Sequence, residues 1–311
     1  MNEEGGSRDA ARTEQVALTD ADRQLMLAAL VDLKPDWTPP VAALRLGSIA
    51  WRPDLIDPNR EICHLHTVAG LRQHWIHRLA SAKDSGYSTT VAAPSVSWYS
   101  SGTLTAVNEL DAAVIVLKAS GTTWQATRYR SVADLIAREK LQLSPKTRAE
   151  IGQTMLGRAL SATSSHERGW RFEDFLCLLF SQVSFFEVFG HNLRNDTEEI
   201  DVVLVNRRVG QWTAPPSPIV LVTAKNTVES VGVQVLSYLR SQMENRRGQC
   251  KLGFLCASRH IASTVSEHEM RFSRSDSVVV LLDGADLQKV IEAPGSLDEM
   301  IEATVTKSML M

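Results

Sequence analysis

Apolar positions along the chain recur in two spacings, which predict alternating helices and strands. The helical spacing is typical of segments at about residues 19–31, 68–83, 98–110, 167–182, 228–244, 261–268 and from 283 onward. Short apolar and β-branched runs predict strands at about 42–49, 61–66, 87–93, 112–117, 124–129, 185–189, 200–205, 219–223, 251–257 and 277–282. This order favours the α/β class, with helices on both faces of a mixed sheet.

Changes in composition divide the chain into four parts. Residues 1–18 are polar and are expected to be a disordered tail, after which Thr19 is placed to cap a helix. Residues 19–130 are expected to form a first α/β domain, and 166–311 a second one. Between them, 131–165 predicts a polar helical linker richer in basic than in acidic residues. That linker either faces solvent or contacts phosphates.

Composition narrows the function classes. The 311 residues are 44% hydrophobic and 22% charged, which is enough for about two domains with cores of their own. The formal net charge is −3, so any nucleic-acid contact must come from local basic points such as 206–208 and 246–247. Four cysteines without CxxC spacing favour structural thiols in a reducing cytoplasm. A polar start and the lack of any run of about 18 apolar residues predict neither signal peptide nor membrane span.

Three charged residues of the second half occur in an order that suggests chemistry. Glu173 lies on an apolar helix, Asp201 lies near the start of a strand, and Lys225 ends the next strand. Singly, Glu173 is also expected as an exposed helix charge and Lys225 as a solvated strand end. Asp201 lies among apolar residues, where an unpartnered carboxylate is costly. Together, two carboxylates and a lysine can converge on a metal-bound water, as in metal-dependent phosphodiesterases.

From about residue 168 to 291 the chain resembles the PD-(D/E)XK nuclease superfamily, most closely its Mrr-like restriction endonuclease branch. The residues that carry the resemblance are Gly169, Glu173, Asp201, Lys225, Gln234 and the run 279–284. The resemblance implies a restriction-endonuclease-like mixed sheet flanked by helices. It also implies Mg²⁺-dependent hydrolysis of DNA, with Mn²⁺ as a substitute, in restriction or antiviral defence.

The resemblance also implies a role for each residue. Asp201 would be the principal metal ligand, and Glu173 a second or water-mediated ligand. Lys225 would position or activate the attacking water and stabilise the developing charge. Gln234 would support the lysine or touch the phosphate.

One position departs from the pattern. Thr223, two residues before Lys225, stands where the family has an acidic residue, and a hydroxyl is a poor ligand for Mg²⁺. Three outcomes stay open. Glu198 or Glu199 supplies the missing metal ligand, Glu229 supplies it from the start of the next helix, or the site is catalytically silent and binds nucleic acid without cutting.

Histidines of the first domain are a second candidate metal site. His64 and His66 lie on one face of a predicted strand, and His74 and His77 lie on the following helix. Such a set can ligate Zn²⁺, although no cysteine pattern joins it. The alternative is a set of surface or hydrogen-bonded histidines.

The first domain repeats part of the plan of the second. The segment with Asp54 resembles the strand with Asp201, and the strand 61–66 places His66 where the second domain has Lys225. A strand, helix and strand follow in the same order. The sequence therefore predicts a duplicated fold whose degenerate N-terminal copy lacks the lysine.

These observations predict a Mg²⁺-dependent DNA endonuclease in a bacterial-type cytoplasm. A homodimer is expected, because cutting both strands of a duplex needs two sites. The alternative is a catalytically silent nuclease-fold module that senses a nucleic acid or nucleotide and signals to a partner.

Overall fold

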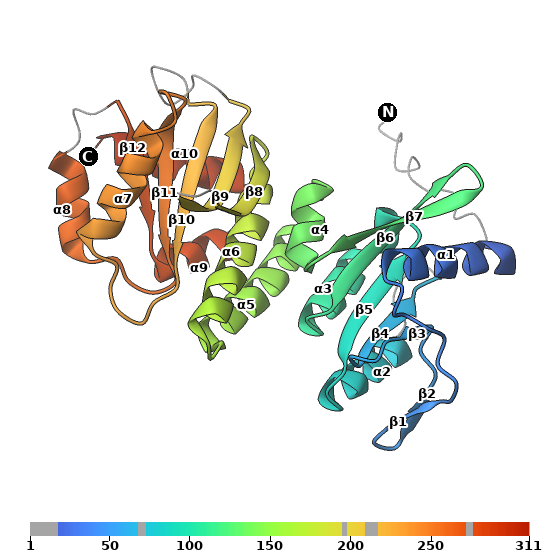
Figure 1. Ribbon diagram of the computed structural model, residues 1–311. Helices are drawn as coiled ribbons and strands as arrows, with labels where there is room; N and C mark the ends of the chain where they lie inside the picture. The colour runs from blue at the N-terminus through green and yellow to red at the C-terminus, as the bar shows by residue number, and fades with distance from the viewer. Residues whose placement is uncertain (1–17, 68–72, 195–197, 209–216, 272–275, 311) are drawn as a thin grey trace, which may run out of the picture.

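Two mixed five-stranded sheets, one in each half of the chain, organise the fold (Figure 1). The computed structural model describes residues 18–67, 73–194, 198–208, 217–271 and 276–310. Its helices are α1 (Asp20–Leu33), α2 (Gln73–Asp84), α3 (Ser101–Glu109), α4 (Val132–Arg138), α5 (Pro145–Ser161), α6 (Ser165–Ser181), α7 (Val233–Glu244), α8 (Ser263–Arg271), α9 (Gly284–Glu292) and α10 (Leu297–Leu310). Its strands are β1 (Leu44–Leu46), β2 (Ile49–Trp51), β3 (Leu55–Ile56), β4 (Glu61–Leu65), β5 (Ser88–Ala93), β6 (Ala113–Ser120), β7 (Thr123–Tyr129), β8 (Phe186–Arg194), β9 (Glu199–Asn206), β10 (Ile219–Lys225), β11 (Cys250–Ala257) and β12 (Val278–Leu282). The predicted α/β class with mixed sheets flanked by helices is confirmed.

The two sheets share part of their topology. The first has the order β3-β4-β5-β6-β7, and the second β8-β9-β10-β11-β12. In β3–β6 the successive pairings are antiparallel, parallel and parallel, and β9–β12 repeat this series. The inner parallel strands β4, β5, β10 and β11 are mostly buried because helices cover both of their faces.

Each face of each sheet packs against its own helices. In the second sheet, Val222 and Phe254 pack in one cluster with Phe175 of α6, whereas Leu221 packs with Leu239 of α7 on the other face. Helices α9 and α10 contribute to the α6 cluster, and α8 to the α7 cluster. In the first sheet α1 covers one face, and α2, α3 and α4 cover the other. Both sheets are therefore central layers.

The segment between the two domains is helical, as predicted, and belongs to the core. Ile136 of α4 and Ile151 of α5 are fully buried in the largest apolar cluster, which also contains residues of both sheets. Figure 1 shows α4, α5 and α6 between the two sheets. The segment is thus not a fully solvated connector, and the two halves share one continuous core.

Local signals fix several helix ends. Thr19 caps α1 through its side chain and forms a capping box with Asp22, so the predicted cap is confirmed. Asp283 does the same for α9 together with Asp286. The predicted tail lies almost wholly outside the described residues, as do positions 68–72 of one predicted helix.

All four cysteines are buried free thiols. In the described ranges, no helix combines the length and the apolar character needed to cross a membrane.

Two glycines of α5 allow a test of the shared core. A Cβ on Gly152 would overlap the fully buried Ile291 of α9, whereas a Cβ on Gly157 would meet nothing within 4 Å. We expect Gly152→Ala to lower the free energy of unfolding by about 1–3 kcal/mol through overpacking. Gly157→Ala is expected to raise it by about 0.5–1 kcal/mol through helix propensity. Urea unfolding of both variants measures the difference, and equal effects would contradict the close packing of α5 on α9.

Candidate active site

Asp201 lies where the β9–β10 hairpin opens. The antiparallel pairing of these strands ends at Val202 and Val222, and one further step of the register would place Asp201 opposite Thr223. Here the Asp201 Oδ2 atom accepts the backbone N–H of Ala224 at 2.7 Å. The carboxylate thus satisfies a donor that the strand partner no longer pairs.

Lys225 follows on the same strand. Residues two apart on a strand share a face, so the half-buried Lys225 lies on the side of the buried Thr223. Burial raises the pKa of Asp201, against the opposing effects of the Ala224 N–H and the positive charge of Lys225. The predicted carboxylate and lysine are therefore electrostatically coupled neighbours at the end of the hairpin.

Asn226 anchors the end of β10. Its Nδ2 atom donates to the carbonyl oxygens of Ala159 and Arg168 at 2.7 and 2.9 Å, and its Oδ1 atom accepts the Ser258 hydroxyl at 2.6 Å. These bonds tie the residue after Lys225 to α5, to α6 and to the residue after β11. The sequence interpretation missed this role.

Glu173 enters from α6. Its side chain is buried, and its Oε2 atom has no hydrogen-bond partner among the described residues. Burial, and then the negative charge of Asp201, raise its pKa to about 7. The predicted helix carboxylate is therefore close enough to Asp201 for the two charges to repel each other in a poorly solvated place.

Arg130, just after β7, brings a cation from the first domain. It forms an ion pair with the buried Asp174, the residue after Glu173, and lies 5.4 Å from the ring centre of Trp170. Its charge also lowers the pKa of Glu173, against the net upward shift. The sequence interpretation gave Arg130 no role in the site and overlooked Asp174, although the Glu-Asp pair within an apolar helix was a signal.

The other carboxylates proposed for the site have partners or lie in solvent. Glu198 pairs with Arg246, and the exposed Glu199 pairs with Arg194 at 2.8 Å. The negative charge of Glu199 still raises the pKa of Glu173 and of Asp201. The side chains of Glu229 and Gln234 are exposed. Across the described part of the chain, no group of three His, Cys, Asp or Glu side chains is arranged to hold a metal ion.

The proposed basic points are mostly neutralised within the chain. Arg207 pairs with Glu187, and Arg208 pairs with Glu302. Arg246 forms an ion pair with Glu198, so of the two neighbouring arginines Arg247 is the exposed one. Free positive charge at these points is therefore smaller than the sequence suggests.

The first domain contains a comparable arrangement. The Asp54 Oδ2 atom accepts the backbone N–H of Leu65 at 2.8 Å and lies 3.0 Å from His64 Nδ1. His66 follows Leu65 as Lys225 follows Ala224, and its ring is fully buried. Burial and the neighbouring His64 lower the pKa of His66 to about 4.

The four histidines are not brought together. His64 stacks on Trp75 with ring centres 4.1 Å apart, whereas His74 and His77 on α2 are exposed. The zinc site suggested by the sequence has no three-ligand group within the described ranges.

Comparison of the chain with protein-family models, with curated proteins and with solved structures finds no match.

The protonation of Glu173 makes stability depend on pH. Its pKa is about 7 in the folded protein against an ordinary 4.5, so the folded state holds the extra proton between these values. Its contribution to stability is thus greatest at low pH and is lost as the pH rises through 7. We expect Glu173→Gln to be more stable than the wild type at pH 8 by about 1–2 kcal/mol, because solvent screens part of the full effect of the pKa shift.

Urea unfolding at pH 5 and pH 8 measures this difference. The exposed Glu244→Gln is the control and should show the same small effect at both pH values. A gap between wild type and Glu173→Gln that does not change with pH would contradict the raised pKa.

Proposed function

We propose that the second domain is a PD-(D/E)XK-type endonuclease of the Mrr-like branch that hydrolyses DNA with Mg²⁺ in defence against foreign DNA. One observation carries the proposal. The buried Glu173 of α6 lies close enough to the half-buried Asp201 of β9 for the charge of Asp201 to raise the pKa of Glu173, and Lys225 lies beside Asp201. A bound cation would relieve the repulsion between Glu173 and Asp201, which is the role we propose for the two carboxylates.

The residues fit Mg²⁺ in donor type. The ion prefers oxygen ligands and keeps several waters, so one or two carboxylates together with a substrate phosphate hold it. Glu173 offers a buried Oε2 atom without a hydrogen-bond partner in the described residues, and Asp201 offers its second oxygen. Bound there, the ion would neutralise charge on the phosphoryl oxygens and lower the pKa of water.

The chain's own cations complete the proposed site. Hydrolysis adds the hydroxyl of a water to phosphorus and a proton to the leaving oxygen. Lys225 would hold that water or a phosphate oxygen, because its ammonium lies on the strand face next to Asp201. Arg130, which belongs to the first domain, lies beside Glu173 and would attract the phosphate backbone of the DNA.

We further propose that the first domain is a degenerate copy of the second. The strand order and directions of β3–β6 match those of β9–β12. In the first domain Asp54 accepts the backbone N–H of Leu65, the residue before His66. In the second domain Asp201 accepts the backbone N–H of Ala224, the residue before Lys225. His66 in place of Lys225 would leave that copy without the catalytic cation. A homodimer would supply the second cutting site for a duplex.

A catalytically silent nucleic-acid-binding module is the second candidate, and one observation favours it. Thr223 stands where the family has an acidic residue, so the site lacks one carboxylate. Glu198 and Glu199 do not replace it, because both pair with arginines. A two-carboxylate site holds a divalent ion weakly unless the substrate phosphate completes it.

Cleavage of supercoiled plasmid with Mg²⁺ or Mn²⁺ tests the enzyme. We expect nicking or linearisation by the wild type, and a loss of at least about 100-fold in Asp201→Asn and Lys225→Gln. Asparagine retains an oxygen that can accept the Ala224 N–H, so folding should survive. Lys146→Gln, whose side chain is 86% exposed on α5, is the control and should cut normally.

Equal cleavage by wild type and Asp201→Asn would refute this site. DNA binding without cleavage, with affinity that falls steeply as salt rises, would support the silent module instead.

Thr223→Glu tests the missing charge. Since affinity for such ions follows the number of ligand charges, we expect roughly tenfold tighter Mg²⁺ binding than in the wild type. Isothermal titration with MgCl₂ measures this, with the exposed Thr306→Glu on α10 as the control. Unchanged affinity in Thr223→Glu would mean that another carboxylate already fills the position or that no metal site exists. Plasmid cleavage by the wild type separates these two cases.

A further inference from the structure

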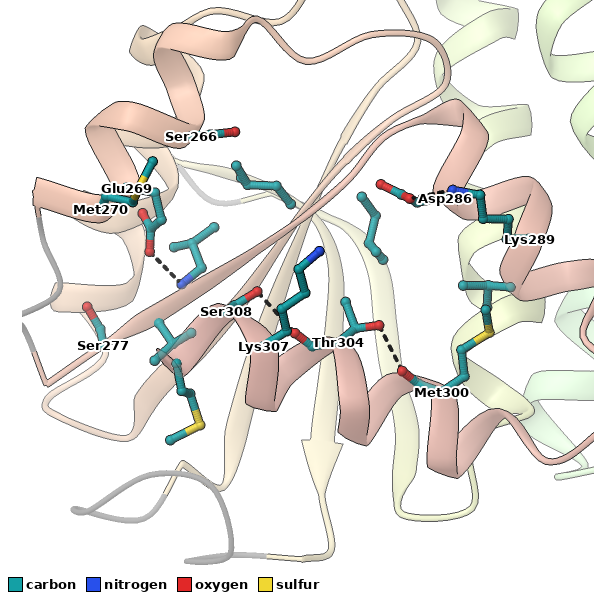
Figure 2. Close-up of a pocket in the computed structure, with 16 residues that line it drawn as sticks. Ser266, Glu269, Met270, Ser277, Asp286, Lys289, Met300, Thr304, Lys307 and Ser308 are labelled. Atoms are coloured by element: carbon teal, nitrogen blue, oxygen red, sulfur yellow. Dashed lines mark hydrogen bonds and ion pairs between the residues drawn. The ribbon is translucent and has the colours of Figure 1, made fainter. Parts of the chain in front are cut away.

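A cavity of about 330 Å³ opens at the outer edge of the second sheet (Figure 2). Neither Glu173 nor Asp201 lines it. It is bounded by the edge strand β12 and by helices α8, α9 and α10. Its apolar lining consists of Met270, Val278, Val279, Leu281, Leu282, Val290, Met300 and Met309. Met270 and Met309 are 45% and 44% exposed, so apolar surface continues to the mouth. A cavity of this size and lining is typical of a site for a small molecule.

The charged residues around the cavity differ in whether they already have an ion-pair partner. Glu269 forms an ion pair with Arg240 and accepts the Val279 N–H at 3.0 Å, and Asp286 lies 3.5 Å from Lys289. Lys307 has no ion-pair partner among the residues that the structure describes. Figure 2 shows its side chain extending from α10 into the middle of the lining residues. The cavity therefore combines apolar walls with one available positive charge.

The edge strand itself is partly blocked. A free strand edge is a place where an extended peptide can add by backbone pairing. Here Glu269 already accepts the N–H of Val279, and α8 and α10 flank the strand. These contacts favour a compact occupant over an added strand.

We propose that this cavity binds a small amphipathic molecule with an apolar body and a single carboxylate. The apolar body lies against β12 and the three methionines, whose unbranched side chains adapt to its shape. The carboxylate lies at Lys307, because the nearby hydroxyls of Thr304 and Ser308 already donate to the backbone carbonyl oxygens of Met300 and Thr304. The site shares no lining residue with the proposed catalytic centre, so it stands whether or not the chain cuts DNA.

Isothermal titration of the full chain with octanoate and with octan-1-ol, each up to about 1 mM, tests the site. The two probes have the same apolar body and differ in charge. We expect one octanoate per chain and binding of octanol about two- to fivefold weaker, the range for one exposed ion pair. In Lys307→Gln the two probes should bind equally, whereas Lys146→Gln should keep the difference.

A second pair of variants locates the site. Thr304→Trp places an indole in the cavity and should abolish binding of both probes, while Thr306→Trp on the exposed side of α10 should leave it unchanged. Circular dichroism and thermal unfolding confirm that the variants fold. The proposal is overturned if wild type binds neither probe or binds both equally. It is also overturned if folded Thr304→Trp, or Lys307→Gln, behaves as the wild type.

Discussion

A single hydrogen bond, from the backbone N–H of Ala224 to the carboxylate of Asp201, defines the end of the β9–β10 hairpin. A ladder that continued would pair that N–H with the neighbouring strand and bury the hairpin end. Instead a carboxylate meets the donor, the strands separate, and a charged group is held among apolar residues. The first domain uses Asp54 and Leu65 in the same way. In each domain the polar site lies where strand pairing is replaced by a side chain.

Burial then sets the chemistry around this point. Glu173 and Asp201 approach each other where little solvent screens them, so the charge of Asp201 favours the neutral form of Glu173. Lys225 from the same sheet and Arg130 from the first domain offset part of this repulsion. Asn226 fixes the end of β10 to the start of α6. The shared core of the two halves is thus also what keeps Arg130 beside the helix that contains Glu173.

The second sheet presents different surfaces at its interior and at its edge. At β9 and β10 the strands open and expose charged groups, whereas at β12 the last strand presents mostly apolar side chains to a cavity. The difference follows from pairing, since an edge strand needs flanking helices or charges to protect it. Glu269 protects the edge at one point by accepting the N–H of Val279, and side chains of β12 line the cavity. One α/β layer therefore offers two chemically distinct places for binding.

The sequence by itself determined the α/β class, most of the order of the elements and the cap at Thr19, because these depend on spacing and local hydrogen bonds. It also singled out Asp201 and Lys225, since charged residues stand out against apolar strands. Only the tertiary structure decided that Arg130 crosses from the first domain, and that Glu198 and Glu199 pair with arginines. It likewise showed that α4 and α5 bury their apolar sides in one shared core. These outcomes depend on contacts between segments far apart in the chain, which local spacing does not encode.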